Sequence, residues 1–190
     1  MQLILIFLSA AIVNNFVLTR FLGLCPFLGI SKKINASLYM GLAVTIVIVL
    51  SAAAGHAVYT FALVALGLEY LHLIVFIIII ASLVQLLEIV LRKVSPSLFS
   101  SLGVFLPLMA TNCIIVGVVI INMGESGTFI ESVVNALGGG VGFLIAITIF
   151  AGIRGRLEEN DVPDIFKGFP IATIIAGLMS IVFMGFAELI

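Results

Sequence analysis

The sequence predicts an all-α integral membrane protein, and three observations lead to that prediction. Of the 190 residues, 63% are hydrophobic and only 9% are charged, far less charge than a soluble domain carries. Six apolar stretches are long enough to cross a bilayer, since a transmembrane helix needs about 20 such residues. The basic residues between these stretches fall in alternate loops. The net charge of −1 and the lack of a basic patch argue against nucleic-acid binding.

The six predicted transmembrane helices follow one another along a single membrane domain that covers residues 1–190. Their approximate ranges are 2–24, 36–58, 71–91, 102–122, 132–153 and 169–189. Residues 56–70 are also apolar, so they either extend the second helix or lie along the membrane interface. The first stretch lacks a positive n-region and a small-residue cleavage site, so we expect a membrane segment that is retained.

The loop charges predict the orientation of these helices. Two loops, near Glu69 and from Asn122 to Glu131, contain no lysine or arginine. If six helices alternate, the other three loops share one side of the membrane and carry seven basic residues: Lys32, Lys33, Arg92, Lys93, Arg154, Arg156 and Lys167. The positive-inside rule places that side in the cytoplasm, so both termini are expected outside.

The same alternation predicts a three-plus-three inverted-topology repeat, with residues 1–95 as the first half and 96–190 as the second. Three is an odd number, so the second half enters the membrane upside down relative to the first. Weak internal similarity supports the repeat, because "CPFLG" begins at Cys25 and "CIIVG" begins at Cys113. At about 1.5 Å per helical residue, each cysteine lies near the membrane midplane.

The first and fourth helices contain residues that interrupt helices. In the first these are Asn14, Asn15, Gly23, Pro26 and Gly29, and in the fourth they are Pro107, Thr111, Asn112 and Gly117. Irregular backbone at membrane depth has to be buried in protein or line a cavity. Sites at the midplane of inverted repeats are often built from such broken helices. We therefore expect breaks beside both cysteines, with Pro26 breaking the first helix next to Cys25.

The residues alone leave three interpretations of the cysteines open. Free cysteine is commonly a small buried hydrophobic residue, two cysteines can form a disulfide, and two can be metal ligands. Cys25 and Cys113 are 88 residues apart, and no CxxC or His–Cys cluster is present. A tetrahedral iron–sulfur site needs four ligands. This chain supplies two, so a second chain would have to supply the others.

Several other residues are unusual for a membrane segment. Asn14, Asn15, Thr111 and Asn112 either form hydrogen bonds between helices or lie on an ion path. Arg20 is expected to reach the cytoplasmic headgroups with its long side chain. "GGGVG" at 138–142 is expected to be a close helix-packing surface, because it lacks the lysine and the preceding strand of a nucleotide-binding loop.

Three segments resemble the family of A subunits of Rnf complexes, and the resemblance extends over essentially the whole chain. They are "VNNFVLTRFLGLCPFLGISKK" (13–33), "LGVFLPLMATNCIIVGVVIIN" (102–122) and "AGIRGRLEENDVPDIFKGFPIATIIAGLMSIVFMGF" (151–186). The E subunit of the sodium-pumping NADH:quinone reductase is similar, but "NNFVL" and "LCPF" favour the Rnf family. The resemblance implies a multi-pass subunit in the lipid of the bacterial inner membrane. The implied complex passes electrons between ferredoxin and NAD and couples this to Na⁺ or H⁺ translocation.

The resemblance also implies partners and a cofactor. The A subunit pairs with its paralogue, the E subunit, as a pseudo-symmetric heterodimer with opposite orientations, and further subunits (B, C, D and G) carry flavins and more iron–sulfur clusters. Paired cysteines of the heterodimer hold a 2Fe–2S cluster in the middle of the membrane, and Cys25 and Cys113 match those positions. Asn14, Asn15, Pro26, Thr111 and Asn112 are then expected to surround the cluster or line an ion path. No residue of this chain is expected to be catalytic alone.

Two other classes of function are compatible with the same pattern. A small secondary transporter or an ion channel uses the same broken-helix repeat, and a scaffold protein needs no chemistry of its own. Cysteine dependence separates these possibilities, because a transporter or a scaffold tolerates serine at both cysteine positions and a cluster site does not.

Overall fold

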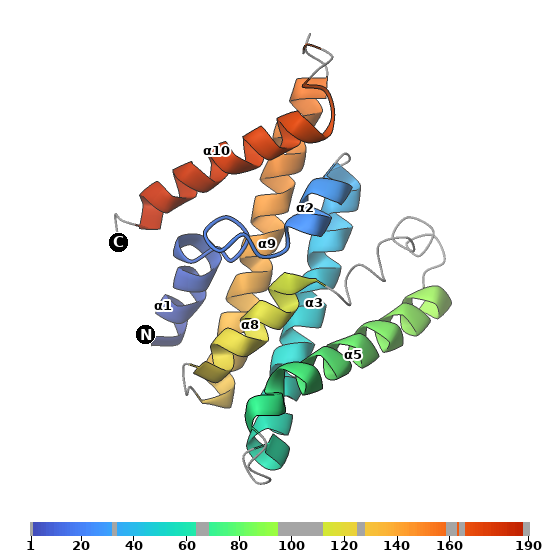
Figure 1. The fold of residues 1–190 in the computed structure, drawn as a ribbon, viewed down its shortest axis with the longest axis vertical. Helices are drawn as coiled ribbons and strands as arrows, with labels where there is room; N and C mark the ends of the chain where they lie inside the picture. Colours follow the sequence, from blue (N-terminus) through green and yellow to red (C-terminus); the bar gives the residue numbers. More distant parts are fainter. Residues whose placement is uncertain are drawn as a thin grey trace.

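The computed structural model describes residues 2–31, 34–63, 69–94, 112–124, 128–158, 163 and 166–187. The regular structure in these ranges is helical throughout (Figure 1). The α-helices are α1 (Gln2–Leu8), α2 (Leu24–Ile30), α3 (Ile34–Val58), α5 (His72–Val94), α8 (Cys113–Gly124), α9 (Phe129–Glu158) and α10 (Phe169–Ala187). They are accompanied by two π-helices, η1 (Ser9–Val13) and η2 (Tyr59–Leu63), and by the 3₁₀-helix η3 (Glu69–Leu71).

The membrane class is confirmed by length and composition. Three helical segments are long and apolar enough to cross a bilayer, and shorter apolar helices accompany them. The spanning segments are Ile34–Phe61, His72–Val90 and Phe129–Leu157, and the shorter ones are Leu3–Val13, Cys113–Asn122 and Phe169–Gly185. The number of spans and the side of the termini stay predictions, since residues 95–111 lie outside the described residues.

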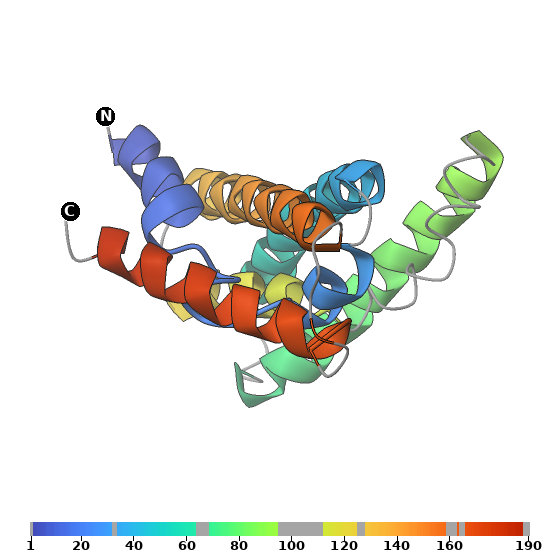
Figure 2. The ribbon, with the colours of Figure 1, turned by 90° about the horizontal axis from the view of Figure 1, so that it is seen from above.

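The two longest helices, α3 and α9, run antiparallel and side by side at the centre of the molecule (Figures 1 and 2). A Cβ atom at Gly41 would lie 3.2 Å from the Leu144 Cα, and one at Gly140 would lie 3.0 Å from the Thr45 Cα. Small residues at these crossings let the backbones approach, and close packing is the main source of helix association in lipid.

The glycine-rich segment 138–142 packs on two neighbours at once. Gly140 faces α3, whereas Gly138 and Gly142 face the first helix. Cβ atoms at Gly138 and Gly142 would each lie 2.8 Å from a backbone oxygen, of Phe7 and Ala11 respectively. This confirms the predicted close helix-packing surface.

The remaining helices surround this pair. In Figure 2, α5 lies on one flank and α10 crosses the other, while the beginning of α1 and the end of α10 lie on the same side. α1 and η1 contact α9, and α8 contacts α3. α5 contacts α8, and α10 contacts both α2 and η1.

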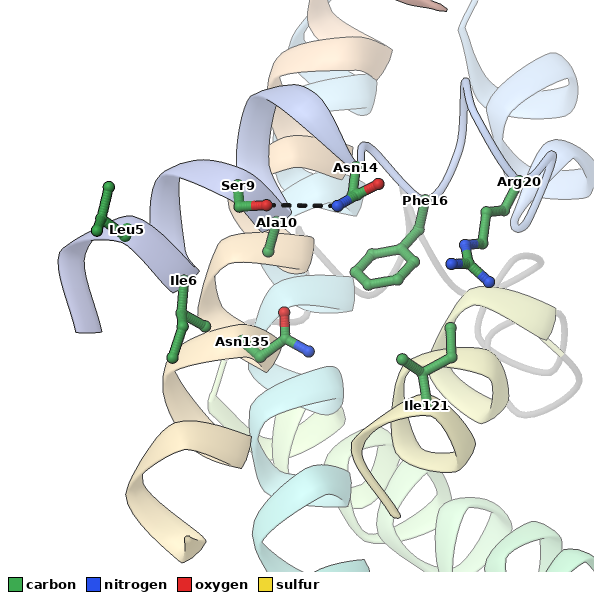
Figure 3. A pocket seen from close by; sticks show the side chains of 9 residues that line it. All are labelled: Leu5, Ile6, Ser9, Ala10, Asn14, Phe16, Arg20, Ile121 and Asn135. Atoms are coloured by element: carbon green, nitrogen blue, oxygen red, sulfur yellow. Dashed lines mark hydrogen bonds between the residues drawn. The ribbon is translucent and has the colours of Figure 1, made fainter. Parts of the chain in front are cut away.

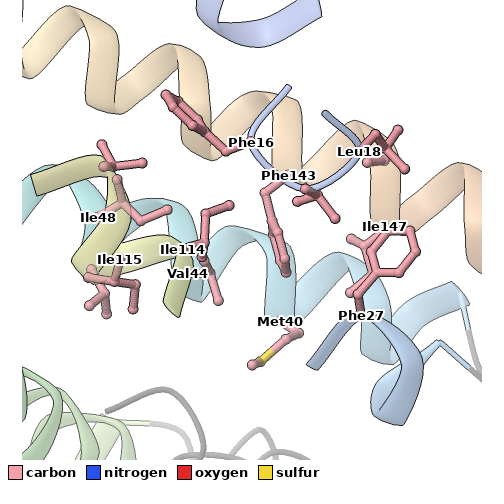
Figure 4. Close-up of a cluster of buried hydrophobic side chains, with 14 of the residues drawn as sticks. Phe16, Leu18, Phe27, Met40, Val44, Ile48, Ile114, Ile115, Phe143 and Ile147 are labelled. Atoms are coloured by element: carbon pink, nitrogen blue, oxygen red, sulfur yellow. The ribbon is translucent and has the colours of Figure 1, made fainter. Parts of the chain in front are cut away.

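The core lies where the non-helical residues 14–23 meet α2, α3, α8 and α9 (Figure 4). Phe27, Met40, Ile114 and Phe143 are completely buried there. Large apolar side chains also cover the outer faces of α5 and α10, where they are exposed. Such faces suit lipid, because hydrocarbon tails are as apolar as the side chains themselves.

Candidate functional site

The first predicted helix is broken between Asn14 and Gly23. Asn14 ends η1 and donates its backbone N–H to the Ser9 carbonyl oxygen at 2.7 Å. The chain then continues without regular helix until α2 begins at Leu24. Gly23 has a φ of +86° and precedes α2, a left-handed conformation that glycine adopts without steric cost.

The prediction that Pro26 breaks this helix is wrong. Pro26 lies in the first turn of α2, directly after Cys25. The first backbone N–H groups of a helix have no partner within it, so proline is tolerated there. The break precedes Pro26 because Asn14, Asn15 and Gly23 provide the turn chemistry instead.

Many polar backbone and side-chain groups in the break form hydrogen bonds with other parts of the protein. Asn15 is buried, and its amide nitrogen donates to the Gly142 carbonyl oxygen of α9 at 2.9 Å. The Asn15 Oδ1 accepts the N–H of Val17 at 3.1 Å. From α10, the Ser180 hydroxyl donates to the Leu18 carbonyl oxygen. Irregular backbone at membrane depth needs such partners, and Asn15 forms one of the expected hydrogen bonds between helices.

The break brings the two cysteine-bearing segments together. Cys25 is the second residue of α2, and Cys113 is the first residue of α8. The backbone N–H of Gly23 donates to the Cys113 Sγ at 3.0 Å. A Cβ at Gly23 would lie 3.2 Å from the Ile114 Cβ. A backbone amide two residues before Cys25 therefore hydrogen-bonds the sulfur of Cys113.

Both thiols are free and exposed in this chain. The exposure argues against the interpretation as buried packing residues, and the free thiols argue against a disulfide. Each sulfur belongs to the first turn of a helix, where unpaired N–H groups and the helix dipole favour negative charge. Within the described ranges, no three Cys, His, Asp or Glu side chains converge.

Asn112 lies immediately before Cys113 and is 2% exposed. Its Oδ1 accepts the N–H of Ile114 at 3.3 Å, while its amide nitrogen has no hydrogen-bond partner among the described residues. A buried donor without an acceptor costs about 1–3 kcal/mol. An acceptor brought in beside Cys113, such as a sulfur, would remove that cost. The predicted site residue Thr111 lies outside the described residues.

Asn14 and Arg20 lie apart from the cysteines, in a pocket of about 320 Å³ between α1, α8 and α9 (Figure 3). Asn14 donates to the Ser9 hydroxyl at 3.3 Å. Arg20 lines this pocket together with Ile121 of α8 and Asn135 near the start of α9. The expectation that Arg20 reaches the cytoplasmic headgroups stays a prediction.

Sequence reasoning missed two residues that hold this region. Ser180 gave no signal, because a single serine in an apolar helix is unremarkable. Arg154 was expected in a loop, but α9 continues to Glu158 and buries Arg154 to 5% exposure. A charged residue just beyond an apolar run is compatible with a loop or with a longer helix, so tertiary contacts determine where Arg154 lies.

Replacing Gly23 with alanine is expected to destabilise the contact between the two cysteine segments. A left-handed conformation costs about 1–2 kcal/mol for a residue with a Cβ, and the new methyl group would press on Ile114. We expect a lower apparent melting temperature and faster alkylation of Cys113. Gly29→Ala is the matched control, because nothing lies within 4 Å of a Cβ at Gly29. Equal behaviour of the two variants would contradict the role given to Gly23.

Comparison with known proteins gives full-length matches. A family model described as "Rnf-Nqr subunit, membrane protein" matches residues 3–190. The chain is 52% identical to the A subunit of the Na(+)-translocating ferredoxin:NAD(+) oxidoreductase complex of Acetobacterium woodii, covering 98% of this chain and 97% of the relative. It is 49% identical to the A subunit of the ion-translocating oxidoreductase complex of Syntrophotalea carbinolica, covering 100% and 98%. The corresponding protein of Vibrio atlanticus is 47% identical, with the same coverage.

Proposed function

This chain belongs to the Rnf-Nqr family of membrane subunits, and on that basis we propose that it is the A-type subunit of an ion-translocating oxidoreductase complex. The proposed complex transfers electrons between ferredoxin and NAD and moves Na⁺ or H⁺ across a bacterial inner membrane. The names of relatives that are about half identical over the full chain support this assignment. The observation that carries the role of this particular chain is the hydrogen bond from the Gly23 N–H to the Cys113 Sγ.

We propose that Cys25 and Cys113 provide two of the four thiolate ligands of a 2Fe–2S cluster. A paralogous E-type subunit would provide the other two as the second half of a pseudo-symmetric heterodimer. The exposure of both thiols supports this proposal, because ligands shared between chains have to reach the surface of each. When bound, such a cluster supplies one-electron transfer between carriers on opposite sides of the membrane.

The residues around the cysteines have defined roles in this proposal. Cys25 and Cys113 lie in the first turns of α2 and α8. Gly23 and Asn112 offer N–H donors beside Cys113. Hydrogen bonds to ligand sulfur are one of the means by which proteins set the potential of iron–sulfur centres.

The inverted repeat is part of the same proposal. The contacts between α3 and α9 are reciprocal, since Gly41 meets Leu144 and Gly140 meets Thr45. Gly41 and Thr45 are four residues apart, as are Gly140 and Leu144, so a two-fold axis in the membrane plane would exchange the two contacts. The pairing of α10 with α2 and of α5 with α8 supports the same axis.

Electron paramagnetic resonance on the reduced protein, co-purified with its paralogous partner, tests the proposed function. We expect the signal of a 2Fe–2S centre, with two irons and two acid-labile sulfides per heterodimer. A heterodimer without iron that still supports electron transfer in the whole complex would refute the cluster. Ion transport by this chain without its electron-transfer partners would favour the secondary transporter.

A further inference from the structure

We propose that Arg154 is a positioning residue for Cys25. It acts through α2, the short helix that carries Cys25 in its first turn and ends at Ile30. Arg154 belongs to α9, which contacts the opposite end of α2. This inference rests on the proposed function, because the position of Cys25 matters for electron transfer only if Cys25 is a cluster ligand. The contacts of Arg154 do not depend on the proposed function.

The guanidinium of Arg154 holds the C-terminal end of α2. Its Nη1 donates to the Leu28 carbonyl oxygen at 2.9 Å and to the Ser31 hydroxyl at 3.1 Å. The last carbonyl groups of a helix have no partner within the helix, and they favour a positive charge. Arg154 therefore pairs with a carbonyl group three residues after Cys25, which also accepts the Ser31 hydroxyl at 3.5 Å.

A second contact lies one helical turn earlier on α9. The ring of Phe150 stacks on the ring of Phe27, with centroids 4.4 Å apart and planes at 29°. Both rings are completely buried. Phe27 is two residues after Cys25, and Phe150 is four residues before Arg154. The two contacts together fix both the position and the rotation of α2 on α9.

The need for these contacts follows from the length of α2. It has seven residues, and isolated helices shorter than about 12 residues are marginally stable. The non-helical segment 14–23 precedes it, so α2 is not the continuation of a longer helix. Cys113 differs, because α8 has 12 residues and packs more extensively on α3 than α2 does. Arg154 is therefore expected to affect Cys25, which α2 carries, much more than Cys113, which is linked to α2 through the Gly23 N–H.

The burial of Arg154 points the same way. A buried guanidinium is costly unless hydrogen bonds compensate for the lost water, and Arg154 is 5% exposed. Arg156, two residues later on the same helix, is exposed and carries the same charge. Arg154 and Arg156 therefore allow a matched comparison of a positioning arginine with a surface arginine.

The test measures alkylation of each cysteine in single-cysteine forms of the full chain, assembled with its partner in membranes after iron chelation. In Arg154→Met, which keeps the aliphatic stem but removes the charge and the donors, Cys25 is expected to react about fivefold faster. Cys113 is expected to stay within about twofold of the wild-type rate. Arg156→Met is expected to change neither rate. Equal acceleration of both cysteines, or of neither, would overturn the proposal.

Rescue by lysine separates positioning from general stability. Arg154→Lys keeps the charge and an N–H donor, so we expect it to restore the wild-type alkylation rate of Cys25. If the methionine variant does not accumulate, Ser31→Ala removes one of the two acceptors and is expected to accelerate Cys25 alone. Failure of both lysine rescue and the Ser31→Ala effect would overturn the role of Arg154. If wild type lacks a cluster signal, the proposed function fails, while the alkylation pattern still decides the role of Arg154.

Discussion

Serine in place of either Cys25 or Cys113 is expected to abolish the 2Fe–2S signal and reduce electron transfer through the complex to background. Iron–sulfur clusters are held by soft thiolate sulfur, and the serine hydroxyl is a hard oxygen ligand of nearly the same size. Each single substitution should have the full effect, because the proposed site has only four ligands. The measurement compares spectra and ferredoxin-dependent NAD reduction in wild type, the two single variants and the double variant.

Assembly is the necessary control for these variants. Both cysteines are exposed in this chain, and serine creates no cavity. The heterodimer should therefore accumulate and co-purify in each variant. Loss of signal with intact assembly supports a ligand role. A variant that keeps both the signal and electron transfer would show that the replaced cysteine is an inert surface residue. If a variant fails to assemble, the iron content of the wild-type heterodimer tests the cluster instead.

Leucine at position 140 is expected to disrupt the central contact between α3 and α9. A Cβ at Gly140 would lie 3.0 Å from the Thr45 Cα, and backbone atoms cannot move aside as a flexible side chain does. Overpacking of this kind costs about 3 kcal/mol or more. We expect a strong loss of assembled protein and a lower melting temperature in detergent, measured by size-exclusion chromatography after heating.

Gly152→Leu is the matched control for this variant. Gly152 lies on the same helix, and nothing lies within 4 Å of a Cβ there. The same side chain, with the same effect on helix propensity and hydropathy, is therefore added without the steric conflict. We expect the Gly152 variant to assemble nearly as well as wild type. If the two variants were equally stable, the close approach of α3 and α9 would not contribute to the fold.

The long apolar helices could be predicted from the sequence because their signal is local and strong. Predicted ranges for the second, third and sixth helices begin within about two residues of the observed starts of α3, α5 and α10. The packing role of the glycine-rich segment 138–142 could also be predicted locally, because the segment consists of small residues and lacks a phosphate-binding signature. The two cysteines were identified as a pair, and the structure links their segments through Gly23.

The details of the break depended on partners far along the chain. Asn15 bonds to Gly142, 127 residues away, and the Leu18 carbonyl accepts from Ser180, 162 residues away. Local reasoning placed the break at Pro26, because proline is the strongest local signal. The depth of Arg20 was likewise counted along an unbroken helix, whereas the regular helix ends at Val13, before Arg20.

Composition and motifs are properties of the chain alone, and they were enough to predict a helical membrane protein of the Rnf-Nqr family with two candidate ligand thiols. The position of the break in the first helix, the contact of Gly23 with Cys113 and the burial of Arg154 against α2 became evident only in the folded chain. This difference follows from the chemistry of the membrane interior. Every backbone group released by a broken helix must find a partner there, and the residues that provide those partners are neighbours only after the chain has folded.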